Sequence, residues 1–193
     1  IILQGDVGHA SWSIGKWCDV AWPLYREDGI NMLRLNSGDD WKYPEVARRA
    51  DEYGMLIHAQ MHPIIDDPVR QTPKRFTPVE QWRQSPFHQA NIANYRRWQR
   101  MLRNSPSVII WSIDNEITAQ TKVTAARQEL NIRNEIILED YARDLESVDP
   151  AMVITRDGDS GTWHSRFAHS QKPIRPVANY HYPDFNIEGQ VLD

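Results

Sequence analysis

Two neighbouring polar residues, Asn115 and Glu116, follow an apolar run that begins at Val108. The run is apolar enough to form a strand that is buried on both faces. Such a strand normally ends in core residues or in a turn, whereas this one ends in an amide and a carboxylic acid side by side. Parallel α/β sheets present catalytic groups at the carboxyl ends of buried strands, and a carboxylic acid there can exchange protons with a substrate. The pair therefore predicts the edge of an active site; the alternative is that it simply begins a loop.

The apolar pattern along the chain alternates between strand-like runs and helix-like periods. Six short runs are expected to be strands: 1–7, 30–35, 55–61, 108–110, 152–155 and 177–182. Apolar residues at helical spacing predict helices around residues 17–25, 43–53, 92–102 and 130–148. Residues 63–86 contain several prolines and are expected to form a long loop.

Strict alternation of strands and helices predicts a parallel α/β sheet with right-handed crossovers. An open doubly wound sheet and a (β/α)8 TIM barrel both fit this pattern. The segment 5–9 lacks the glycine pattern of a phosphate-binding loop, while polar residues follow nearly all six strands, as in a barrel whose top face is a site. A complete barrel needs eight strands and typically about 250 residues. We therefore expect one domain, 1–193, that forms a TIM barrel truncated after about six βα units, with the seventh and eighth units in the remainder of the parent polypeptide.

Composition restricts the class of protein and its partners. The chain has 193 residues, 40% of them hydrophobic, enough for one globular core. No apolar stretch approaches the ~20 residues of a membrane span, and the first residues lack the basic start of a signal peptide. No membrane partner is therefore expected, and cytoplasmic, periplasmic and secreted locations all remain compatible. A net charge of −4 with mixed signs argues against a nucleic-acid partner, and the lone Cys18 excludes an internal disulfide.

No metal or other cofactor is expected from the motifs. The seven histidines occur without an HExxH or a His/Cys cluster, and the acidic pairs at 66–67 and at 157 and 159 lack the length and glycine of a calcium loop. No Gly-x-Ser-x-Gly elbow indicates a serine nucleophile. Eight tryptophans and seven tyrosines are more informative, because flat aromatic faces suit the apolar sides of sugar rings, although they also fill ordinary cores.

Residues 104–116, which end in Trp-Ser-Ile-Asp-Asn-Glu, resemble the fourth-strand signature of glycoside hydrolase family 2. This family contains β-galactosidases, β-glucuronidases and β-mannosidases and belongs to the clan A retaining glycosidases. Residues 28–34 are similar to its second strand, 50–56 to the helix before its third strand, and 179–182 to its sixth strand. The resemblance implies a hydrolase of carbohydrate metabolism that uses no cofactor and acts on an oligo- or polysaccharide. Accessory β-sandwich domains, common in the family, would lie outside this chain.

The resemblance also implies roles for the polar residues after the second, third and fourth strands. Retaining hydrolysis uses two carboxyl groups about 5–5.5 Å apart. Glu116 would be the general acid/base, and Asn115 would bind the 2-hydroxyl of the sugar. Arg34 would hold the nucleophile carboxylate ionised, with a surface ion pair as the alternative. His62 would contact substrate hydroxyls or serve only as a loop residue.

Residues after the fifth and sixth strands are candidates for the sugar pocket. Period-2 alternation favours Asn179 and His181 on the site face, with Tyr182 still able to reach the site from the strand end. His181 stands where the family often has a Tyr that supports the nucleophile, which puts that role in question. Asp157 and Trp163 follow the fifth strand, although ordinary turn chemistry also explains Asp157.

The nucleophile is not identified in this sequence. In the family it is a Glu at the end of the seventh strand, and the late Glu188 has no apolar strand before it. We therefore expect the nucleophile beyond the chain end and the isolated chain to be inactive. Two other functions remain open: a carbohydrate-binding barrel that lacks the second carboxylate, and a metabolic α/β enzyme acting on phosphorylated substrates.

Overall fold

The computed structural model describes residues 2–5, 14–35, 43–63, 76–115, 117 and 125–157. Within these ranges strands and helices alternate along the chain, as the sequence predicts. The strands are β1 (Ile2–Gly5), β2 (Met32–Leu35), β3 (Leu56–Gln60), β4 (Val108–Asn115) and β5 (Ile154–Asp157). The helices are α1 (Ile14–Glu27), α2 (Tyr43–Tyr53), α3 (Val79–Arg83), α4 (Pro86–Leu102) and α5 (Ala125–Val148). The expected strand at 177–182 lies outside the described residues.

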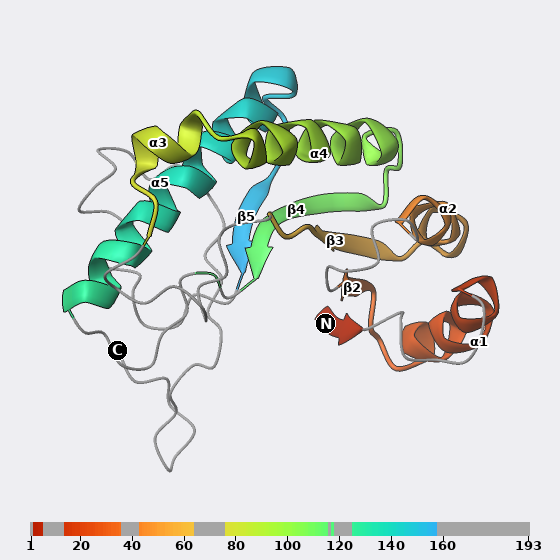
Figure 1. The fold of residues 1–193 in the computed structure, drawn as a ribbon. Helices are drawn as coiled ribbons and strands as arrows, with labels where there is room; N and C mark the ends of the chain where they lie inside the picture. Colours follow the sequence, from red (N-terminus) through yellow and green to blue (C-terminus); the bar gives the residue numbers. More distant parts are fainter. Residues whose placement is uncertain are drawn as a thin grey trace, which may run out of the picture.

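The described strands form one parallel sheet with the order β1-β2-β3-β4-β5. A doubly wound sheet reverses its strand order part of the way along. With right-handed crossovers, a sequential order instead places the helices on one face of the sheet. Accordingly α1 contacts α2, α2 contacts α4, and α4 contacts α5, so the helices follow the strands in chain order (Figure 1). This sequential strand order is that of a barrel wall. Closure of the barrel and the total number of βα units depend on residues outside the described ranges.

The helices end where the sequence predicts. Gly29, two residues after the end of α1, and Gly54, directly after α2, have φ angles of 78° and 65°. This left-handed conformation ends a helix and is favourable mainly for glycine. At the start of α4, the Ser85 hydroxyl accepts a hydrogen bond of 3.1 Å from the His88 backbone N–H, and Pro86 occupies the first helical position.

The described part of the expected loop at 63–86 includes an element that the sequence does not predict, the short helix α3. Five residues are too few to show helical periodicity, and so short a helix depends on tertiary contacts. Trp82 is buried, and the guanidinium of Arg133 on α5 lies 5.0 Å from its ring centroid. Arg83 donates two hydrogen bonds, of 2.7 and 2.8 Å, to the carboxylate of Asp140 on α5. Contacts with α5 therefore stabilise α3.

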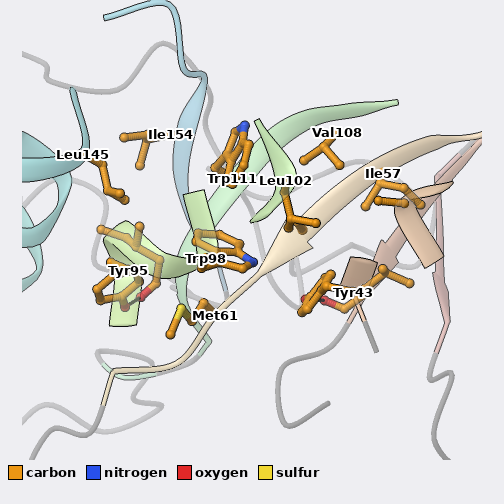
Figure 2. Close-up of a cluster of buried hydrophobic side chains, with 14 of the residues drawn as sticks. Tyr43, Ile57, Met61, Tyr95, Trp98, Leu102, Val108, Trp111, Leu145 and Ile154 are labelled. Carbon is orange, nitrogen blue, oxygen red and sulfur yellow. Dashed lines mark hydrogen bonds between the residues drawn. The ribbon is translucent and has the colours of Figure 1, made fainter. Parts of the chain in front are cut away.

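The core between the helices and the sheet is built around an aromatic cluster. Trp98 on α4 packs edge-on against Tyr43, Tyr95 and Trp111, with ring centroids 6.4, 6.2 and 4.8 Å away (Figure 2). These rings connect α2, α4 and β4. Among the tryptophans in the described residues, Trp22, Trp82, Trp98 and Trp111 are buried. For these four the core interpretation is correct.

Candidate active site

The two faces of the sheet differ in chemistry. One face, toward the helices, carries aliphatic and aromatic side chains such as Leu33, Ile57 and Trp111. The opposite face, called here the polar face, carries Arg34, His58, Gln60, Ser112 and Thr155, all of them buried. The register places Arg34 beside His58, Gln60 beside Ser112, and Ser112 beside Thr155. Because buried polar side chains are uncommon and costly, this band across four strands marks a candidate site.

A β-bulge in β4 brings Asn115 to the polar face. Ser112 lies opposite Thr155 and Asn115 lies opposite Asp157, so β4 advances three residues while β5 advances two. Under strict alternation Asn115 would share a face with Ile113, toward the helices. The extra residue returns Asn115 to the face of Ser112. Bulges of this kind redirect side chains and are frequent beside active sites.

Side chains from neighbouring elements satisfy the carbonyl groups of the bulge. The Tyr95 hydroxyl on α4 donates a 2.5 Å hydrogen bond to the Ile113 carbonyl. The Asp114 carbonyl accepts two hydrogen bonds of 2.9 Å, one from Ser112 Oγ and one from Gln60 Nε2. A buried carbonyl that loses its ladder partner must find another donor. These three donors therefore hold the irregular backbone in one conformation.

The Asn115 side chain is fixed by two donors from the neighbouring strands. Its Oδ1 accepts a 2.6 Å hydrogen bond from Arg34 Nη2 and a 3.4 Å hydrogen bond from Gln60 Nε2. Since both donors face the oxygen, the Asn115 amide nitrogen is directed away from them and can donate elsewhere. Arg34 is only 6% exposed, and the Asn115 amide is one of its partners. The surface position that the alternative interpretation requires is therefore wrong.

Tyr43 at the start of α2 anchors the carboxyl end of β3. Its hydroxyl accepts a 2.9 Å hydrogen bond from the Gln60 backbone N–H and donates to the Gln60 carbonyl at 2.5 Å. The Leu35 carbonyl, at the end of β2, lies 3.4 Å from the same hydroxyl. One helical side chain thus ties together the ends of two adjacent strands, next to the residues that contact Asn115.

The structure places four of the sequence-predicted site residues. Arg34 and Asn115 are in direct contact, His62 is exposed just after β3, and the backbone of Asp157 at the end of β5 pairs with Asn115. All four lie near the carboxyl ends of their strands. The other five predicted residues lie outside the described part of the chain: Glu116, Trp163, Asn179, His181 and Tyr182.

The polar-face residues that the sequence analysis missed include the two on β3, His58 and Gln60. A signal for them exists, because they are the two polar residues in the otherwise apolar run at 55–61 and are separated by two positions. Period-2 spacing puts them on one face of a strand. Because the strand is buried on both faces, the side chains of His58 and Gln60 must both find hydrogen-bond partners on that face.

Metal binding and membrane insertion gain no support from the described residues. Among them, no three His, Cys, Asp or Glu side chains are grouped so that they could hold a metal ion. None of the helices in these ranges combines the length and the apolar character needed to cross a bilayer.

By sequence, no protein-family model and no curated protein matches the chain. By structure, it is similar to β-glucuronidase 2 of Bacteroides uniformis covalently bound to cyclophellitol-6-carboxylate aziridine, with a TM-score of 0.55 and 20% identity over 81% of this chain and 17% of that one. It is also similar to a GH2 β-galacturonidase from Eisenbergiella tayi bound to galacturonate (TM-score 0.50, 17% identity, covering 79% of this chain and 24% of that one). For the β-mannanase of the blue mussel Mytilus edulis the TM-score is 0.53 at 13% identity, covering 85% of this chain and 62% of the mannanase. The chain thus spans about a fifth of the length of the first two enzymes, and it shares with all three the fold of part of their catalytic regions.

Proposed function

We propose that the chain forms the first part of the catalytic barrel of a retaining glycosidase that acts on a β-linked glycoside, with Glu116 as the general acid/base. One observation carries the proposal. Asn115, the residue directly before Glu116, ends β4 at the carboxyl edge of the sheet, where the bulge and Arg34 hold its amide. An Asn-Glu pair that merely began a loop would need no such support.

Asn115 suits recognition of a sugar hydroxyl next to the reacting carbon. Its oxygen is occupied by Arg34 and Gln60, so its amide nitrogen can donate to the 2-hydroxyl oxygen. In retaining glycosidases a hydrogen bond to the 2-hydroxyl strengthens in the transition state and therefore contributes to turnover. Arg34, a buried cation in contact with Asn115, is proposed to bind the nucleophile carboxylate as well.

The remaining candidates are proposed to shape the sugar pocket. They are His62, Asp157, Trp163, Asn179, His181 and Tyr182. Polar groups among them would bind hydroxyls, and the indole of Trp163 would stack on an apolar sugar face. The substrate would be the terminal β-linked sugar of an oligo- or polysaccharide. Two of the similar enzymes carry ligands with a carboxylate, a cyclophellitol-6-carboxylate aziridine and galacturonate, so a β-uronide belongs in any substrate panel beside galactosides, glucosides and mannosides.

The test is the substitution Glu116→Gln in the full-length protein that contains this chain. Turnover of p-nitrophenyl β-glycosides is expected to fall about 10²–10⁴-fold, the range for loss of a general acid/base. The matched control is Glu129→Gln, an exposed glutamate on α5, which should leave turnover unchanged. Full activity of the Glu116→Gln protein would contradict the proposal. A wild-type protein that binds glycosides and hydrolyses none would be a carbohydrate-binding barrel instead.

A further inference from the structure

We propose that Gln60 is a positioning residue that aligns the Asn115 amide for the sugar. The inference rests on the proposed function and extends it to a residue that does not itself touch the substrate. Gln60 ends β3, is completely buried and lies beside Ser112 across the β3–β4 ladder. It therefore faces the bulge from the neighbouring strand.

A single amide group performs the alignment. Gln60 Nε2 lies 2.9 Å from the Asp114 carbonyl and 3.4 Å from Asn115 Oδ1. An amide nitrogen carries two hydrogens, so both hydrogen bonds can form at once. One side chain thereby fixes the backbone of the bulge and the side chain that follows it. Tyr43 fixes the Gln60 backbone in turn, so this donor is held by the scaffold.

The orientation of the Asn115 amide decides what it offers to a ligand. Rotating the group by 180° would exchange the positions of its oxygen and nitrogen and present an acceptor in place of a donor. The flipped amide would direct N–H groups at the N–H groups of Arg34 and Gln60. Two converging donors therefore exclude the flip more strongly than Arg34 alone.

Two substitutions separate the donor function of Gln60 from its size. Gln60→Met keeps the length of the side chain and removes both donors, whereas Gln60→Glu replaces the donor with an acceptor. We expect kcat/KM for a glycoside with a free 2-hydroxyl to fall about tenfold in Gln60→Met and further in Gln60→Glu, mainly through kcat. The control is Gln99→Met, because Gln99 is equally buried on α4 and its amide donates to the Leu145 carbonyl. It should lower stability and leave kcat/KM unchanged.

A double-mutant cycle shows whether Gln60 acts through Asn115. If it does, Gln60→Met should cause almost no further loss in an Asn115→Ala background, and almost none with the 2-deoxy analogue of the substrate. Additive losses in the double variant, or an undiminished loss with the 2-deoxy substrate, would overturn the inference.

A readout that does not require turnover separates this inference from the proposed function. The side-chain NH₂ resonances of Asn115, assigned by comparison with Asn115→Ala, should shift in Gln60→Met and exchange faster with solvent. The same resonances should be unchanged in Gln99→Met. Unchanged Asn115 signals in Gln60→Met would refute the positioning role even if Glu116 proves to be catalytic. Altered signals would support it even if Glu116→Gln retains activity.

Discussion

Arg34 illustrates how a single residue type can mark a site. A guanidinium removed from water is costly unless hydrogen bonds compensate it, and a strand interior has no structural need for one. Arg34 nevertheless lies buried on the polar face and donates to the Asn115 amide oxygen. The planar fork of arginine carries several further donors in fixed directions, a geometry that suits carboxylates. Its position beside Asn115 therefore supports the proposal that Arg34 also binds an anionic group.

His88 should make stability depend on pH. It is buried at the start of α4, against the Tyr141 ring, and burial lowers its pKa below the ordinary value; Arg83, Asp140 and Asp144 are the charged groups near it. In the unfolded chain, His88 binds a proton at about pH 6.5. In the folded protein a lower pH is needed to protonate it. The free energy of unfolding should therefore fall as the pH drops below about 6.5. Urea denaturation between about pH 7.5 and about pH 5.5 should show a larger decrease for wild type than for His88→Gln; equal decreases would contradict this assignment.

At the scale of elements, the bulge in β4 depends on the helix that covers it. Tyr95→Phe removes the donor to the Ile113 carbonyl and leaves that buried group unsatisfied, which should cost about 1–3 kcal/mol in urea denaturation. Because Asn115 lies two residues further on, we also expect kcat to decrease. Tyr141→Phe is the control, since the Tyr141 hydroxyl accepts hydrogen bonds from Trp82 on α3 and Asn91 on α4 and none from β4 is among its known partners. It should lose comparable stability and keep its kcat; an equal decrease in kcat for both would show that the bulge is not specifically involved.

At the scale of the whole molecule, the aromatic cluster around Trp98 joins the helix layer to the sheet. Trp98 is buried and contacts rings from α2, α4 and β4, so Trp98→Ala should reduce the free energy of unfolding by about 3–5 kcal/mol. Leu24→Ala on α1 is the control, because Leu24 is 54% exposed and surface changes usually stay within about 0.5 kcal/mol. Urea denaturation of both variants measures the difference. Similar midpoints for the two would mean that the cluster does not hold the layers together.

Local sequence was sufficient for most of the architecture. Apolar runs predicted β1 to β5, and apolar residues at helical spacing predicted α1, α2, α4 and α5. It was not sufficient for α3, a helix of five residues whose stability comes from Trp82 and Arg83 docking on α5. Periodicity needs several turns to be visible, whereas one buried indole and one ion pair leave no periodic trace.

For the candidate site residues, too, the local sequence predicted one part and the tertiary structure decided the other. Arg34 and Asn115 could be selected in advance because each is a polar residue at the end of an apolar strand, and such ends meet at one edge of a parallel sheet. The contact between them, the choice of face for Asn115 and the involvement of Gln60 could not be selected in this way. They depend on one extra residue in the β4–β5 register, which reverses the face expected from alternation. The hydrophobic pattern therefore determined which strands exist and which end carries the candidate site residues. Only the tertiary structure decided which side chains meet, because register is set by pairing between strands far apart in the chain.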